Sequence, residues 1–272
     1  MNSSKKHPSR HGIALKKQHG QCFLKDETVI QDMIAEVRLD DQTTVVEIGC
    51  GEGILTEAIL NEPCKNLFVF EIDEEWYSYV KEEYGSDQRL HISCENILDV
   101  PFTERMSEHA PLVVLANLPY HITFPIFYMF HNSRDLIREG VIMIQEEVAQ
   151  KLVKVFGRTY GYTSLFFQHY FEMRLLNKVP PTAFYPAPKV FSRLLYFKPK
   201  ADVPVIPDEE KFWKFIKGCF QFPRRTLRNN LLSSQYDGSQ LSEDLLVLRA
   251  QQLSMTDLLK IWNILNVPET EQ

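Results

Sequence analysis

The sequence lacks the patterns that mark several large classes of protein. Its five cysteines show no C-x-x-C spacing and are odd in number, which argues against a zinc site or a disulfide framework and favours a reducing, cytoplasmic setting. The eight histidines are scattered without an H-E-x-x-H pairing, so we expect no metal. No apolar run approaches the length of about eighteen residues that a membrane helix needs, so we expect no membrane span.

Acidic residues are missing from two segments, although the whole chain has a net charge of −6. Residues 1–25 and 211–228 carry 12 of the 30 basic residues, which leaves 18 against 36 acids elsewhere. A basic tail and a basic helix on an acidic body can form an anion-binding surface, whereas the plainer interpretation is a solvated tail and helix face. The tail lacks the apolar stretch of a secretory signal, and its acid-free, Ser- and Lys-bearing composition is one that a transit peptide shares.

Short apolar runs alternate with helical patterns over most of the chain. At 272 residues and 44% hydrophobic, the chain can bury one large core and one small one. Strands that alternate with helices indicate βα units and a mostly parallel sheet, and the last two runs, joined by the proline-rich loop PPTAFYPAPK, suit an antiparallel edge. The expected strands are 43–48, 67–72, 90–93, 112–116, 141–145, 170–179 and 192–198.

A proline-rich linker marks the expected domain boundary. Residues 199–207 hold three prolines, and residues 208–267 are helical in pattern. We therefore expect a basic entry segment at 1–25, an α/β domain at 26–200 and a small helical domain at 201–272. Nothing in the sequence demands an oligomer, so we expect a monomer.

A glycine-rich turn follows the first expected strand. The stretch EIGCGEGILT places Glu47, Gly49, Gly51 and Gly53 where a strand passes into a helix. Glycines let the backbone turn tightly and let a ligand approach it. The spacing differs from the G-x-G-x-x-G of dinucleotide sites, and Glu52 would lie where a pyrophosphate should bind. A cofactor without phosphates fits better, and the plainer interpretation is an ordinary tight turn.

Two polar residues at later strand ends suit such a cofactor. Glu71 ends the second strand, where its carboxylate can accept both hydroxyl protons of a ribose. Asn96 follows the third strand, where its side-chain oxygen can accept a hydrogen bond from an adenine amino group. Together with the glycines they indicate a pocket for an unphosphorylated nucleoside, and S-adenosylmethionine is the common cofactor of that kind. Taken alone, Glu71 is equally a solvated strand end.

The stretch ANLPY ends the fourth strand at the same edge. The Asn117 amide oxygen and the Leu118 carbonyl can accept the two hydrogens of an adenine amine, which localises the nitrogen lone pair. Pro119 fixes the backbone angle, and Tyr120 offers a ring that can stack on the base. Such a site accelerates methyl transfer through positioning and electrostatics, and its target base must be extruded or single-stranded. The plainer interpretation is a turn that stops a strand.

These motifs resemble the RNA adenine-N6 dimethyltransferases, and most of all the bacterial small-subunit rRNA dimethyltransferase A family with its eukaryotic and mitochondrial relatives. The resemblance covers nearly the whole chain and implies a Rossmann-like class I methyltransferase sheet followed by a small C-terminal helical domain. Besides E-I-G-x-G-x-G and N-L-P-Y, the matching stretches are KKQHGQCFLKD (16–26), MIQEEVAQKL (143–152), AFYPAPKVFS (183–192) and RRTLRNNL (224–231).

The resemblance implies a role for particular residues of this chain. The residues implied at the target adenine are Asn117, Leu118, Tyr120 and Phe184. Those implied at the cofactor are Cys22, Leu24, Glu47, Gly49, Gly51, Glu71, Asn96 and Asn117. Those implied at the RNA are Lys16, Lys17, Arg224, Arg225 and Arg228. The chain departs from the family pattern at Cys22 (Asn or His in the family), Asn96 (usually Asp) and Phe222-Pro223 (Gln-Arg). Leu24 and Phe184 are equally suited to be plain core residues.

The function implied is the S-adenosylmethionine-dependent N6,N6-dimethylation of two adjacent adenines in a small-subunit rRNA loop, with the immature small ribosomal subunit as partner. The basic segments would then follow RNA phosphates. A large-subunit rRNA methyltransferase of the macrolide-resistance type is an alternative that the AFYPAPKV loop disfavours. A ribosome-assembly factor that docks with little turnover is another, and the intact N-L-P-Y disfavours it. A DNA adenine methyltransferase would usually carry proline where Leu118 stands.

Overall fold

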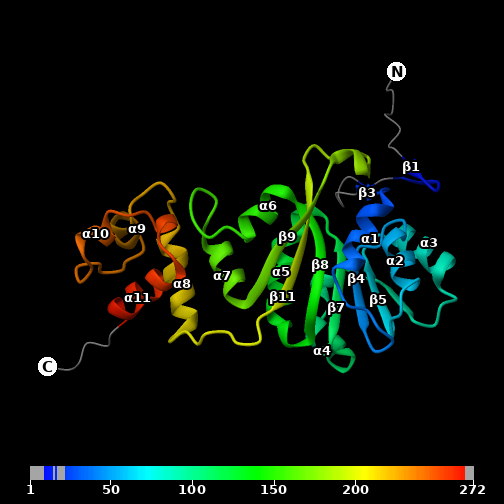
Figure 1. Ribbon diagram of the computed structural model, residues 1–272, viewed down its shortest axis with the longest axis horizontal. Coiled ribbons are helices and arrows are strands. Elements are labelled where there is room, and N and C mark those ends of the chain that lie inside the picture. The colour runs from blue at the N-terminus through cyan, green and yellow to red at the C-terminus, as the bar shows by residue number, and fades with distance from the viewer. Residues whose placement is uncertain (1–8, 15, 17–21, 267–272) are drawn as a thin grey trace, which may run out of the picture. The chain divides into compact units, whose positions relative to one another are not determined.

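The computed structural model describes residues 9–14, 16 and 22–266, and the structural statements below refer to these residues (Figure 1). The chain divides into two compact units. The first runs to Ala149 and resumes over Glu172–Pro199, and the second combines Gln150–Phe171 with the chain from Lys200 onward. In the described part of the chain, no helix is long and apolar enough to cross a membrane.

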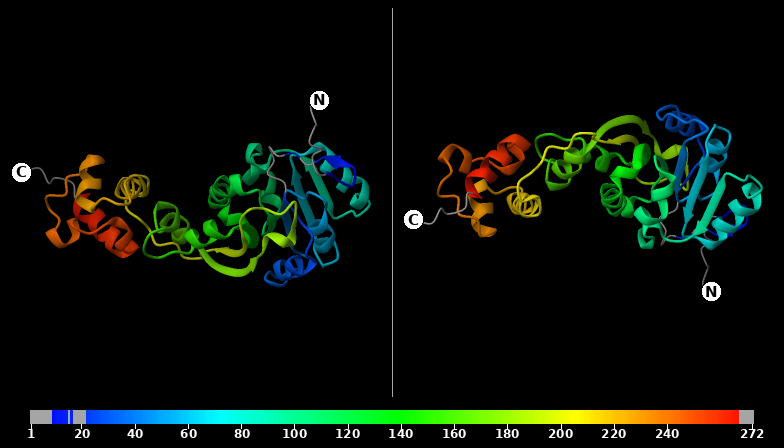
Figure 2. Two further views of the ribbon diagram at one scale, coloured as in Figure 1. Left: turned by 90° about the horizontal axis from the view of Figure 1, so that it is seen from above. Right: turned by 90° about the horizontal axis from the view of Figure 1, so that it is seen from below.

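A seven-stranded sheet forms the centre of the first unit, and its strands follow one another across a twisted surface (Figure 2). The strand order is β6-β5-β4-β7-β8-β11-β9. Strands β6 to β8 pair in parallel, and β11 pairs antiparallel with β8, which confirms the predicted parallel sheet with an antiparallel edge. The strands are β4 (Thr44–Ile48), β5 (Asn66–Glu71), β6 (Leu90–Cys94), β7 (Leu112–Asn117), β8 (Ile137–Gln145), β9 (Phe171–Val179) and β11 (Ser192–Pro199).

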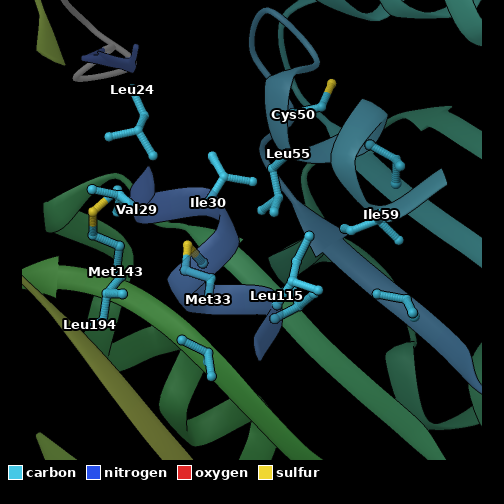
Figure 3. Packing of buried hydrophobic residues seen from close by; sticks show 14 of the residues in the cluster. Leu24, Val29, Ile30, Met33, Cys50, Leu55, Ile59, Leu115, Met143 and Leu194 are labelled. Atoms are coloured by element: carbon cyan, nitrogen blue, oxygen red, sulfur yellow. The ribbon is translucent and has the colours of Figure 1, made fainter. Parts of the chain in front are cut away.

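Apolar strands buried on both faces explain why this sheet forms. All five residues of β4 are buried, and so are the first five of β7, as in parallel sheets covered by helices on both sides. On one face, Ile30 and Met33 of α1 share a core with Leu55 of α2 and Leu115 of β7 (Figure 3). The helices of this unit are α1 (Glu27–Ala35), α2 (Ile54–Leu60), α3 (Glu74–Tyr84), α4 (Phe102–Met106) and α5 (Thr123–Asn132).

Helix α5 packs on β11 through aromatic rings. The rings of Phe130 and Phe197 stack with centroids 5.0 Å apart, and Phe127 lies 5.8 Å from Phe197. A Cβ at Gly140 of β8 would meet the Phe197 ring at 2.6 Å, so glycine is needed for this close approach. The aromatic layer therefore fixes the outer strands against α5.

Two pairs of very short strands lie outside the large sheet. Strand β3 (Phe23–Leu24) pairs antiparallel with β10 (Phe184–Tyr185), so that Leu24 lies opposite Phe184. Strands β1 (Ser9–Arg10) and β2 (Ile13–Ala14) form an antiparallel hairpin near the N-terminus.

The described residues of the second unit form helices and connecting loops, apart from Phe171, which begins β9. Trp213 joins two of its helices, since its indole N–H donates to the Tyr170 hydroxyl at 3.0 Å and its ring lies 4.9 Å from that of Phe166. The helices are α7 (Tyr162–Tyr170), α8 (Glu209–Cys219), α9 (Leu227–Ser233), α10 (Glu243–Leu246) and α11 (Met255–Leu265), while α6 (Glu146–Leu152) spans the junction of the units.

The observed division differs from the expected one at one segment. The expected boundary between 200 and 201 falls one residue after Pro199, where the structure changes unit. Residues 150–171, which we placed in the α/β domain, group instead with the helical unit. The reason is the aromatic packing of α7 on Trp213 of α8, a contact between residues far apart in sequence.

Candidate active site

A cavity of about 220 Å³ opens at the carboxyl ends of the central strands, next to the point between β4 and β7 where the strand order reverses. Every residue that we expected at the cofactor or the adenine lines this one cavity, although these residues come from six separate segments. They are Cys22, Leu24, Glu47, Gly49, Gly51, Glu71, Asn96, Asn117, Leu118, Tyr120 and Phe184.

The glycine turn shapes one wall of the cavity. Gly49 has a φ of +74°, and a Cβ there would meet no atom within 4 Å, so the backbone faces open space. Gly51 has a φ of +51°, and a Cβ there would come within 2.7 Å of the Phe23 ring. Glycine is thus required at both positions for the positive φ, and at Gly51 also for the close approach of Phe23.

The Glu71 carboxylate is buried and held on both oxygens. One oxygen accepts the Gly51 N–H at 3.1 Å and the Cys50 thiol at 3.6 Å, and the other accepts the Asp73 N–H at 2.9 Å. The oxygen bound to Asp73 can accept one further hydrogen bond, and the other oxygen can accept one when a ligand hydroxyl replaces the weak thiol donor of Cys50. The carboxylate is therefore fixed in place and can bind two ligand hydroxyls once the thiol bond is replaced.

Glu47 contributes a second buried carboxyl group. It is 1% exposed, and one oxygen accepts the Thr56 hydroxyl at 2.7 Å, whereas the other has no partner among the described residues. Burial raises the pKa of Glu47 to about 8, helped by the nearby charge of Glu71. A buried oxygen without a partner at a cavity wall is a place where a ligand donor can bind.

Asn96 caps the short helical turn Ile97–Asp99. Its side-chain oxygen accepts the Leu98 N–H at 3.2 Å, and its side-chain nitrogen donates to the Asp99 carboxylate at 2.9 Å. These two bonds orient the amide and leave one lone pair of its oxygen for a ligand.

The Asn117–Tyr120 segment is tied to its surroundings at three points. The Asn117 side-chain nitrogen donates to the Cys22 carbonyl at 3.5 Å, and the Leu118 N–H donates to the Met143 carbonyl at 3.1 Å. The Tyr120 hydroxyl hydrogen-bonds the buried Ser192 hydroxyl at 2.7 Å, and burial raises the pKa of Tyr120. With its nitrogen bound to Cys22, the Asn117 amide keeps its oxygen as the atom that can accept a substrate hydrogen.

Leu24 and Phe184 are 2% and 3% exposed, so both are core residues as well as lining residues. They lie opposite each other in the β3–β10 pair, and the Lys25 N–H donates to the Ala183 carbonyl at 2.9 Å. The proline-rich loop and the entry segment, distant in sequence, thus build one wall together.

Ile72 is one of the lining residues that the sequence reasoning missed. Ile72 lines the cavity and is 50% exposed, which is unusual for a large apolar side chain. It stands between Glu71 and Asp73, the cap of α3, and offers an apolar surface for a flat ring. The signal was an apolar residue directly after the strand-ending glutamate.

The residues expected at the RNA have varied surroundings. Lys16 forms ion pairs with Asp73 at 2.6 Å and Glu75 at 2.8 Å, which raise its pKa, so an RNA contact at Lys16 would compete with two carboxylates. Lys17 lies outside the described residues. Arg228 is paired with Glu243.

The expectation of one basic helix over 211–228 is wrong. Helix α8 ends at Cys219 and α9 begins at Leu227, so Arg224 and Arg225 lie on the connecting turn. Pro223 explains the interruption, because proline cannot continue the helical hydrogen bonds and disfavours the helical conformation in the residue before it.

The strand order, the glycine turn after β4 and the acid that ends β5 define a class I methyltransferase. The chain belongs to a particular family of that class, the ribosomal RNA adenine dimethylases, because the family model with the description "Ribosomal RNA adenine dimethylase" matches residues 12–266. Among the described residues, no group of three or more His, Cys, Asp or Glu side chains could hold a metal ion.

Similar proteins agree with this assignment. The chain is 36% identical over 246 residues to the ribosomal RNA small subunit methyltransferase A of Prosthecochloris aestuarii. This match covers 90% of this chain and 92% of the relative. It is 36% identical over 256 residues to the protein of that name from Chlorobaculum tepidum, covering 94% and 90%.

Solved structures share the fold at lower identity. A dimethyladenosine transferase from Plasmodium falciparum superposes with a TM-score of 0.73 at 22% identity, covering 89% of this chain and 97% of that one. The 23S rRNA methyltransferase ErmE superposes with a TM-score of 0.68 at 20% identity, covering 90% and 100%.

Proposed function

We propose that this protein transfers methyl groups from S-adenosylmethionine to N6 of adenines in small-subunit rRNA, two methyl groups per adenine. The observation that carries the proposal is the shared cavity, in which the Asn117–Tyr120 segment faces the same space as Glu71 and the glycine turn. One group of residues suits a nucleoside cofactor, the other suits an exocyclic amine, and the cavity brings them together.

The lining residues fit S-adenosylmethionine. The fixed Glu71 carboxylate suits the two ribose hydroxyls, the Asn96 oxygen suits the adenine amine, and Ile72 suits the face of the adenine ring. The Glu71 carboxylate adds negative charge, which attracts a cationic sulfonium and disfavours a phosphate. When bound, the cofactor supplies a methyl group on a positively charged sulfur.

The Asn117 amide activates the target amine. The N6 lone pair of adenine is delocalised into the ring, so the amine is a poor nucleophile. Hydrogen bonds from the amine to the Asn117 oxygen and the Leu118 carbonyl favour a geometry in which the lone pair points toward the methyl group. The amine loses its proton as it becomes positively charged, so no strong base is required. The Tyr120 ring, fixed through Ser192, supports the base.

Three observations favour small-subunit rRNA as the substrate. The relatives that are 36% identical over 90% or more of this chain are named as small-subunit methyltransferases. The cavity requires an unstacked base, as in a loop or an unpaired strand. Arg224 and Arg225 add an exposed basic site. We further propose that the target is a pair of adjacent adenines in the immature subunit and that the protein acts as a monomer.

A large-subunit substrate is the second candidate, since the 23S rRNA methyltransferase ErmE shares the fold. Its 20% identity supports the fold alone. A docking factor with little turnover is disfavoured, because such a factor needs no oriented Asn117 amide at the cavity.

The test is methyl transfer to small subunits that lack the modification. The purified protein is incubated with labelled S-adenosylmethionine and these subunits, and the digested RNA is analysed for nucleosides. We expect N6,N6-dimethyladenosine in the small-subunit RNA. Transfer of label to large subunits under the same conditions would support the second candidate. Binding to small subunits without any transfer of label would contradict the enzymatic proposal and support the docking factor.

A further inference from the structure

The connection between α8 and α9, residues 221–226, displays two adjacent exposed arginines. We call it the arginine turn. Arg228, in contrast, is paired with Glu243, while no carboxylate of the described residues lies within ion-pair distance of Arg224 or Arg225. The charge of these two side chains is therefore available to a polyanion.

The backbone of the arginine turn is closed. The Arg225 N–H donates to the Phe222 carbonyl at 2.9 Å, which makes residues 222–225 a hydrogen-bonded turn with Pro223 at its second position. Proline fixes its own φ there and so reduces the conformations open to the turn. The Phe222-Pro223 pair, a departure from the family pattern, thus stiffens the segment that carries the arginines.

Asn230 of α9 holds this turn from inside. It is 1% exposed, and its side-chain oxygen accepts the Phe222 N–H at 3.0 Å. Its side-chain nitrogen faces the carbonyls of Phe222 at 3.2 Å, Thr226 at 3.3 Å and Arg225 at 3.5 Å. A buried amide bonded at both ends ties several backbone groups of the turn to α9.

The Arg225 guanidinium is also held in a defined position. It lies 4.1 Å from the centroid of the Phe222 ring and donates to the Ser233 hydroxyl at 3.3 Å. A guanidinium stacked on a ring keeps free N–H groups at its edge, where they can bind a phosphate in a bidentate manner. Phe222 itself is 37% exposed.

The family resemblance already implies an RNA contact at Arg224 and Arg225. We propose that Asn230 is the positioning residue of this contact, because it holds the arginine turn as a preformed clasp for the phosphodiester backbone. The inference rests on the proposed action on rRNA and adds how the helical unit contacts that substrate. A preformed turn loses little conformational entropy on binding, so its shape as well as its charge contributes to affinity. The occupant is RNA rather than an acidic protein because two adjacent arginines on a rigid turn suit the regular phosphates of a nucleic acid.

The experiment compares four proteins in binding to small ribosomal subunits that lack the modification, at several salt concentrations. They are the wild type, Asn230→Ala, the double variant Arg224→Ala/Arg225→Ala, and the matched control Asn229→Ala, whose side chain is exposed. We expect the double variant to flatten the salt dependence, since each phosphate contact contributes about 0.7–0.9 to the slope. Asn230→Ala should weaken binding about fivefold or more and flatten the slope although no charge is removed. The control should match the wild type.

Combining Asn230→Ala with the double arginine variant distinguishes a positioning role of Asn230 from a role in folding alone. Asn230→Ala in the double-variant background should cause no further loss of RNA affinity if Asn230 acts through the arginines, whereas a structural role would add its own loss. Pro223→Gly loosens the turn from the exposed side and leaves the buried amide intact, so it provides a second variant if Asn230→Ala unfolds. Hydrogen exchange at the Phe222 amide should rise in Asn230→Ala while the exchange of α11 stays unchanged.

An unchanged affinity and slope for Asn230→Ala, with the Phe222 amide exposed to exchange, would overturn the clasp. If the variants lose affinity for intact subunits but bind protein-free rRNA as well as the wild type does, the turn contacts a ribosomal protein. That result would overturn RNA as its partner. Failure of the proposed function has another signature, because the wild type itself would then not methylate the subunits.

Discussion

The side-chain nitrogen of Asn117 donates to the backbone carbonyl of Cys22 across 95 positions of sequence, at 3.5 Å. Asn117 ends β7 of the large sheet, whereas Cys22 directly precedes β3. Because the partner at Cys22 is a backbone atom, the bond is independent of the cysteine side chain. The departure from the family pattern at Cys22 therefore leaves the orientation of the amide intact.

Asn117→Ala should lower the methylation rate by orders of magnitude while S-adenosylmethionine binding changes little. The reason is that the amide oxygen acts on the target amine, which is activated only in the transition state. Single-turnover methylation of small subunits and equilibrium binding of the cofactor measure the two effects separately. Collapse of cofactor binding, with normal turnover per bound cofactor, would show that Asn117 serves the cofactor instead.

Glu71→Gln should weaken cofactor binding by about tenfold or more. An amide replaces one acceptor oxygen by a donor, so it loses a charge-assisted bond to a ribose hydroxyl and places N–H beside the N–H of Gly51 or Asp73. Titration calorimetry with S-adenosylmethionine measures the change, and adenine alone provides a ligand without ribose that both proteins should bind equally. A similar loss of affinity for adenine would show that Glu71 does not act through the ribose.

Asn96→Asp, which restores the usual family residue, should weaken cofactor binding in this chain. Asn96 donates to the Asp99 carboxylate at 2.9 Å, and an aspartate at position 96 would put two carboxylates in contact. The exchange Asn96→Asp/Asp99→Asn restores the donor and acceptor with their roles reversed, so it should recover the affinity. Equilibrium binding of S-adenosylmethionine to the wild type and to both variants tests this prediction. Equal affinity of the single and double variants would exclude a coupling between positions 96 and 99.

Glu47 should make the cofactor-free protein less stable as the pH rises from about 4 to about 8. Its folded pKa of about 8 lies above the unfolded value, so the folded state binds more protons in this range and loses stability as the pH increases. Glu47→Gln keeps the bond from Thr56 and removes the titration. Its free energy of unfolding at pH 9 should exceed that of the wild type by a few kcal/mol, in order of magnitude.

Denaturant unfolding at pH 5, 7 and 9 measures this difference, with the exposed Glu104→Gln as the matched control. The control should follow the wild type at every pH. A parallel loss of stability in the wild type and in Glu47→Gln would show that another group titrates in this range.

The sequence by itself determined the sheet and the motif residues that line the cavity. The central strands β4 and β7 are apolar runs bounded by polar or glycine residues, and such local patterns set where a chain can be buried. The parallel order followed from the alternation with helices, which places the strand ends, and so Glu71, Asn96 and Asn117, at one edge. The motifs were visible because the proposed chemistry of the site requires particular residue types at those ends.

Only the tertiary structure decided how these residues are held and which unit each helix joins. The bonds of Asn117 to Cys22, Tyr120 to Ser192 and Trp213 to Tyr170 each connect positions more than 40 residues apart, and no local pattern specifies such partners. The arginine turn shows the same limit. A run of basic residues gives the charge of a surface, but the burial of Asn230 beneath it depends on how two helices pack.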